Sequence, residues 1–144
     1  MYQIVQTEDY VMIMVEMAHD ARIIPIDKGH RPDAWKPWLG DSVAHWDGDV
    51  LVVETSNLHP QQAPRNIAAL SDEGKVVERF SRYSDDQILY EFEVTDPVFY
   101  TEAWSGEMAF NATDTQPYEY ACHEGNYGLP GILAGARRLE MEEQ

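Results

Sequence analysis

The chain has little of several residue types, and each scarcity narrows its class. Cys122 is its one cysteine, so no intrachain disulfide can form and the usual sign of an oxidising compartment is missing. No apolar run approaches the ~20 residues that a membrane-spanning helix needs. The N-terminal residues Met1–Val5 carry no basic region followed by an apolar stretch, so the chain as given predicts no signal peptide.

The standard catalytic signatures are also absent. The sequence contains no Gly-x-Ser-x-Gly, no glycine-rich phosphate loop, no His-Glu-x-x-His and no Cys-x-x-Cys pair. Its histidines are scattered without a close ligand pair, at His19, His30, His45, His59 and His123. Their spacing gives no support to a metal site. We therefore expect no metal and no organic cofactor.

Basic residues are few, and acidic residues dominate the charge. Ten Lys and Arg stand against 26 Asp and Glu, which gives a formal net charge of -16 over 144 residues. Such a chain repels nucleic acid and anionic membranes, so neither is an expected partner, and its charge favours solubility. Apolar residues make up 44% of the chain, enough for the core of one domain, residues 1–144.

Strand patterns dominate what is present. The clearest is a hairpin over Ser42–Thr55, where Asp47-Gly48 predicts a two-residue turn. A second hairpin joins Val76–Tyr83 to Gln87–Thr95, whose apolar residues alternate with polar ones. Further strands are predicted over Tyr2–Gln6, Tyr10–Met17, Ala21–Ile26, Thr101–Phe110 and Tyr118–His123, and a short helix after Leu129.

About eight strands joined mainly by hairpins must bury their apolar faces. Closure into an antiparallel up-and-down β-barrel, lipocalin-like and followed by the short C-terminal helix, removes the open edges. A two-layer β-sandwich is the alternative. Small barrels of this kind can hold one small ligand.

The densest polar cluster is Tyr118–Gly128. Within it, His123 can exchange a proton near neutral pH, Glu124 can orient it, and Tyr120 can position a substrate. The structural alternative is a histidine that only hydrogen-bonds a loop. Cys122 is expected to be a small core residue.

A second cluster, His19-Asp20-Ala21-Arg22, follows the methionine-rich strand. Asp20 and Arg22 share a face if this stretch is extended, and the pair can clamp the structure or bind a substrate. Glu54 alternates with Val50 and Val52. If that face is apolar and internal, Glu54 can serve as an acid or a base. Otherwise it reaches water or pairs with an arginine.

Three tryptophans complete the set of candidate site residues. Trp35 and Trp38 lie in the proline-containing loop Gly29–Gly40, and Trp46 lies in the first hairpin. Tryptophans in a loop usually pin it over the core, but they can also cover the mouth of a pocket. The second reading makes them part of a ligand site.

Several segments resemble a group of uncharacterised bacterial proteins. The resemblance is carried by Ala21–Asp27, Trp38–Ser42, Trp46–Thr55, Val77–Phe80 and Tyr118–Gly128, and covers most of the chain. It implies no activity. It does imply a periplasmic or exported setting, where the chain alone would suggest the cytoplasm, and a longer form whose N-terminal segment completes the fold.

Two functional hypotheses follow. The first is a small β-barrel enzyme that acts on a small organic molecule by acid–base chemistry, as an isomerase, lyase or hydrolase. His123 would carry the proton, with Glu54 or Glu124 in support. The second is a non-catalytic binding module for an apolar or aromatic small ligand. A purely structural domain that forms a homodimer remains a third reading. Polar side chains converging at the base of a cavity would favour the enzyme.

Overall fold

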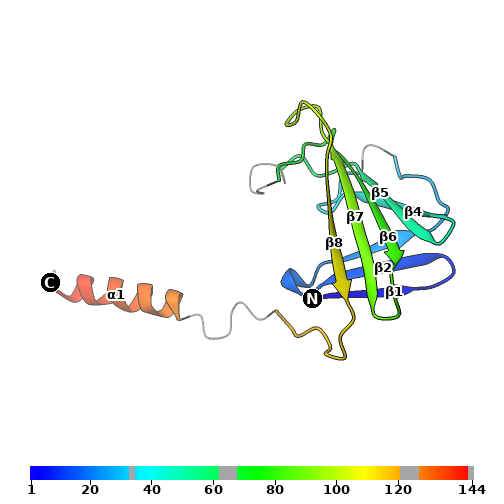
Figure 1. The fold of residues 1–144 in the computed structure, drawn as a ribbon. Coiled ribbons are helices and arrows are strands. Elements are labelled where there is room, and N and C mark those ends of the chain that lie inside the picture. The colour runs from blue at the N-terminus through cyan, green and yellow to red at the C-terminus, as the bar shows by residue number, and fades with distance from the viewer. Residues whose placement is uncertain (33–34, 62–67, 121–126, 143–144) are drawn as a thin grey trace.

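The computed structural model describes residues 1–32, 35–61, 68–120 and 127–142. Over these residues the chain forms two antiparallel sheets and one helix (Figure 1). The mainly β prediction is therefore confirmed. The elements are β1 (Tyr2–Gln6), β2 (Tyr10–Val15), the short 3₁₀ helix η1 (Met17–His19), β3 (Ala21–Pro25), β4 (Asp41–Asp47), β5 (Val50–Ser56), β6 (Lys75–Arg82), β7 (Gln87–Thr95), β8 (Trp104–Asn111) and α1 (Gly128–Glu142).

Each sheet is a meander in which consecutive strands pair. The order is β1-β2-β3 in the smaller sheet and β4-β5-β6-β7-β8 in the larger one. Figure 1 shows the smaller sheet lying across one end of the larger sheet. The predicted hairpins are present because alternation of apolar and polar residues suits strands with one buried face.

The turn of the first hairpin lies one residue later than predicted. Asp47 pairs with Val50, so the two turn residues are Gly48 and Asp49. Gly48 has φ +61, and Asp49 does not have a positive φ. A positive φ at the first turn position alone is typical of a type II′ turn, in which glycine occupies that position. The prediction placed Asp47-Gly48 in the turn because an Asp-Gly pair is typical of a type I′ turn, and it was wrong because Gly48 instead begins a turn of type II′.

The two sheets do not close into a barrel over the described residues, so this part of the fold prediction is not confirmed and the sandwich-like alternative fits. Where β3 approaches β4, the backbone pairing is an isolated parallel bridge between Ile26 and Ala44. The next residue, Asp27, has φ +53 and donates its N–H to the Ala44 carbonyl at 2.8 Å. This conformation turns the chain out of the strand direction, into the proline-containing loop that precedes β4.

The hydrophobic core lies between the two sheets. It combines Val11 and Ile13 of β2 with Ile24 of β3, and these pack against Val53 of β5 and Phe80 of β6. Ile24 and Val53 have no exposed surface. Burying side chains of this size contributes about 1.5–3 kcal/mol each.

The C-terminal part of the fold confirms one prediction and corrects another. Helix α1 is present over Gly128–Glu142, but none of its residues is buried and it extends away from both sheets (Figure 1). Residues 118–120 of the predicted strand Tyr118–His123 are not extended in a sheet, and the rest of that segment lies outside the described residues. Tyr118 donates its N–H to Glu16 at 3.3 Å instead of to a neighbouring strand. Within the described residues, no helix is long and apolar enough to cross a membrane.

Asp96 fastens the end of β7 to the loop before β6. Its carboxylate accepts hydrogen bonds from the backbone and hydroxyl of Ser71 and from the N–H groups of Val98 and Phe99. Burial by itself would raise the pKa of Asp96, but these donors favour the charged form and hold the pKa below its usual value.

We expect Asp96→Asn to lower the free energy of unfolding by about 1–3 kcal/mol at neutral pH, because one amide cannot accept all of these hydrogen bonds. The low folded-state pKa means that the contribution is present above the unfolded pKa, near 3.8, and is lost as pH falls through the folded pKa. Urea unfolding at several pH values measures both effects. Asp49→Asn, in the exposed turn, is the matched control. Equal stability of the two variants at neutral pH would contradict this role.

Candidate functional site

A cavity of about 480 Å³ lies between the inner faces of the two sheets. Its size is within the ~300–1,000 Å³ of known small-molecule sites. The aliphatic part of the lining comes from both sheets and from the loops beside them: Ile13, Val15, Met17, Leu39, Leu58, Leu70, Val76 and Met108. Most of the walls are therefore apolar.

One wall of the cavity is aromatic. Tyr90 of β7 lies at its centre, with ring centroids 5.0 Å from Phe80 and from Phe110, and 5.7 Å from Phe92. Tyr2 of β1 stacks on Phe110 at 5.1 Å and so joins the edge of the smaller sheet to this wall. Rings at these separations stabilise one another beyond their buried area. The rings of Tyr2, Phe80, Tyr90, Phe92 and Phe110 therefore form the aromatic part of the lining.

Three polar side chains meet within these apolar walls. Arg22 of β3 donates two hydrogen bonds to the carboxylate of Glu78 on β6, at 2.6 and 2.9 Å. The Tyr90 hydroxyl donates to the same carboxylate at 3.0 Å. The side chain of Glu78 is 7% exposed and that of Arg22 is 21% exposed. The bidentate pairing compensates the cost of taking both charges out of water.

Strand register explains why these groups converge. Arg22 lies between Ala21 and Ile23 on β3 and shares the inner face with Ile24, while its cross-strand partner on β2 is the buried Ile13. Glu78 lies two residues before Phe80 on the inner face of β6. Both charged residues thus occupy positions at which the alternation places a side chain between the sheets.

The environment of Tyr90 keeps its phenol protonated. Burial raises the pKa of Tyr90, and the neighbouring negative charge of Glu78 raises it further, as does the hydrogen bond to that carboxylate. Tyr90 is therefore a fixed hydrogen-bond donor to Glu78. Both oxygens of Glu78 accept hydrogen bonds, from Arg22 and from Tyr90, so the protein itself satisfies this carboxylate.

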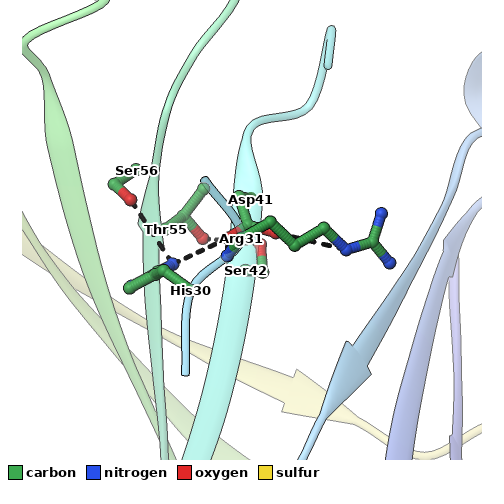
Figure 2. A network of polar contacts seen from close by, with 6 residues as sticks. All are labelled: His30, Arg31, Asp41, Ser42, Thr55 and Ser56. Carbon is green, nitrogen blue, oxygen red and sulfur yellow. Dashed lines mark hydrogen bonds and ion pairs between the residues drawn. The ribbon is translucent and has the colours of Figure 1, made fainter. Parts of the chain in front are cut away.

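Figure 2 shows a second polar network at the start of β4. Asp41 is buried and accepts hydrogen bonds from the Nδ1 of His30 at 2.9 Å and from the backbone N–H of Arg31 at 2.8 Å. The Ser56 hydroxyl lies 3.4 Å from the same Nδ1. A hydrolytic triad needs its acid and its serine on opposite nitrogens of the histidine. This network instead fastens the loop before β4 to the β4–β5 hairpin.

A hydrogen bond between β4 and β5 lies next to this network and extends the polar contacts toward the cavity. The hydroxyls of Ser42 and Thr55 lie 2.8 Å apart across β4 and β5, as Figure 2 shows. Thr55 also lines the cavity. The buried hydroxyl pair is satisfied internally, which removes the cost of desolvating it.

The structure brings two of the sequence-predicted site residues to the cavity. Arg22 lies inside it and Asp20, which is exposed, lies at its rim. His19 ends the helix η1 with φ +56, is exposed and does not line the cavity. Tyr120 is about half exposed and is also not among the lining residues.

Of the two alternatives for Glu54, the apolar interior is wrong and the side chain reaches water. Its side chain is 53% exposed and lies 3.9 Å from His45 on the outer face of the larger sheet. The inner face of β5 carries Leu51, Val53 and Thr55 instead. Both faces of this strand carry valines, so alternation alone does not distinguish inside from outside.

The three tryptophans also lie outside the lining of the cavity. Trp35 packs under the guanidinium of Arg31, 4.0 Å from its ring centroid, and Trp38 stacks on His59 at 4.1 Å. Trp46, near the hairpin turn, is partly exposed. His123 and Glu124, the predicted proton carrier and its partner, lie outside the described residues, as does Cys122. In the part of the chain that is described, no group of three His, Cys, Asp or Glu side chains could hold a metal ion.

The sequence reasoning did not identify Glu78 and Tyr90 as site residues. A signal for Glu78 was present, because an acid that alternates with Val76 and Phe80 falls on the apolar face of its strand. Arg22, at a similarly apolar position, supplied the complementary charge. An unpaired acid and an unpaired base on two apolar faces predict a buried ion pair.

We expect Arg22→Met to destabilise the fold by about 3–5 kcal/mol, because it leaves the buried Glu78 carboxylate without its partner, and Glu78→Met to destabilise it by less, because the Arg22 side chain is 21% exposed. The double variant should lose much less than the sum of the two. Urea unfolding of all four proteins gives the coupling free energy. Additive losses would show that the pair does not hold the sheets together.

A separate prediction concerns Tyr90 at alkaline pH. Its raised pKa means that the contribution of the protonated phenol to stability is present below the unfolded pKa, near 10, and is lost as pH rises toward the folded pKa. Tyrosinate absorbance of the folded protein should therefore be the same for wild type and Tyr90→Phe just above pH 10. Tyr83→Phe, which removes a phenol that is 74% exposed, is the control. A lower signal from Tyr90→Phe at that pH would contradict the prediction.

No protein-family model, curated protein or solved structure matches the chain. The resemblance to uncharacterised bacterial proteins thus stays a prediction from the sequence motifs. What the chain does has to be argued from the cavity and its side chains.

Proposed function

We propose that the chain is a binding module for a small apolar or aromatic molecule, which it holds between its two sheets. The observation that carries this proposal is the cavity of about 480 Å³ with an aromatic wall and one internally paired polar group. Apolar lining with a few fixed polar groups is the usual character of small-molecule sites.

In this proposal the two sheets together enclose the ligand as an incompletely closed barrel. The bridge between Ile26 and Ala44 links the sheets at one side, and the stacked rings of Tyr2 and Phe110 link them at the other. The strands follow one another around the cavity in sequence order, as in an up-and-down barrel that holds one ligand. The cavity is partly open to solvent, which gives a ligand a route into the interior.

Binding is favoured over acid–base catalysis by the state of the polar groups. Glu78 is held by three hydrogen bonds and Tyr90 is fixed as a donor, so neither is free to move a proton. Glu54 lies on the opposite face of the larger sheet. Within the described residues, the side chains of the cavity are therefore better suited to binding a ligand than to transferring a proton.

The test uses the neutral fluorescent probe N-phenyl-1-naphthylamine, whose emission rises in apolar sites. We expect saturable binding to the wild-type protein. Met108→Trp adds an indole to the cavity wall and should weaken binding about tenfold, a cost of ~1.4 kcal/mol. Met14→Trp makes the same change on β2 outside the cavity lining and is the matched control.

Far-UV circular dichroism and thermal unfolding establish that both variants are folded. The proposal fails if the probe does not bind the wild-type protein, or if Met108→Trp weakens binding no more than Met14→Trp does. Probe binding to helix α1, which extends away from both sheets, would leave both variants at wild-type affinity and so produce the second of these results.

A further inference from the structure

Acidic side chains outnumber basic ones in the described lining of the cavity. Its ionisable side chains at neutral pH are Asp20 and Glu78 on the negative side and Arg22 on the positive side. Arg22 and Glu78 neutralise one another through their bidentate contact. The charge left over is that of Asp20, which is exposed at the rim.

Among the residues that the structure describes, Arg22 is the one cation of the lining, and an anionic ligand could pair with it only at the expense of Glu78. Moving the guanidinium toward a ligand would leave a carboxylate that is 7% exposed without its counter-ion. The loss of one partner of a buried ion pair is strongly destabilising. The arginine is thus committed to the protein and does not recognise an anion.

The aromatic wall is consistent with a ring compound as the ligand, because Tyr90, Phe92 and Phe110 line the cavity. The net charge of -16 acts on an approaching ligand in the same direction as the charge of Asp20, although salt screens it.

We propose, building on the binding function above, that the cavity selects neutral or cationic aromatic molecules and discriminates against anionic ones. Asp20 at the rim sets this preference. The ligand class is an aromatic amine or a similar uncharged ring compound, and not a carboxylate, sulfonate or phosphate.

Three naphthalene probes test the charge preference. N-Phenyl-1-naphthylamine is neutral, its 8-sulfonate is the same molecule with one negative charge, and N-(1-naphthyl)ethylenediamine is a cation. Isothermal titration calorimetry at low ionic strength gives a Kd for each. We expect the neutral and cationic probes to bind at least about tenfold more tightly than the sulfonate, which corresponds to ~1.4 kcal/mol.

Asp20→Asn should reduce this ratio severalfold, chiefly by tightening sulfonate binding. Asp49→Asn removes the same charge in the turn between β4 and β5, away from the cavity lining, and should leave the ratio unchanged. This control separates a local effect of Asp20 from the effect of net charge.

The outcomes separate this inference from the function on which it rests. If no probe binds, the binding function itself fails. If the neutral probe binds but the sulfonate binds as tightly or more tightly, the charge preference alone is overturned. A ratio that changes equally in Asp20→Asn and Asp49→Asn also overturns it, because the selectivity would then come from net charge and not from Asp20.

Discussion

A partly buried ion pair spans the space between the two sheets. Arg22 extends from β3 of the smaller sheet and Glu78 from β6 of the larger one, and they meet through two hydrogen bonds. If the sheets slid relative to one another, both charges would lose their partner in surroundings that water reaches poorly. The pair therefore opposes displacement of the sheets, because its two directional hydrogen bonds depend on their relative position.

The same ion pair accounts for the space beside it. Val11, Ile24 and Val53 fill one part of the interior as a close-packed core. Where Arg22 and Glu78 meet, a long side chain bridges the sheets, and the neighbouring apolar residues line a cavity instead of filling it. Tyr90 joins the aromatic wall to the ion pair through its hydroxyl, so the three polar side chains at this place are satisfied by one another.

Much of the local structure could be predicted from the sequence. Alternation located the hairpins, and helical spacing located α1, because these patterns depend on neighbours in the chain. The face of Glu54 could not be predicted, since valines occupy both faces of β5. Whether the sheets close into a barrel could also not be predicted, because it depends on the pairing between β3 and β4 and on the backbone conformation of Asp27.

The residues of the candidate site could likewise be predicted only in part. Arg22 and Asp20 were recognised from their position after a strand, whereas the partner of Arg22 is 56 residues away and is found only when the sheets are placed face to face. The motif around His123 drew attention because its polar residues are adjacent in sequence. Adjacency of that kind says little about which side chains meet in a cavity.

Ligand binding between the sheets can be measured directly at the six methionines of the chain. Met17 and Met108 line the cavity, whereas Met12 and Met14 of β2 do not, and Met141 lies on helix α1. In a ¹³C-methyl NMR titration with N-phenyl-1-naphthylamine, the account predicts that the Met17 and Met108 resonances shift and that those of Met12, Met14 and Met141 do not. Shifts confined to Met141, or to Met12 and Met14, would contradict it.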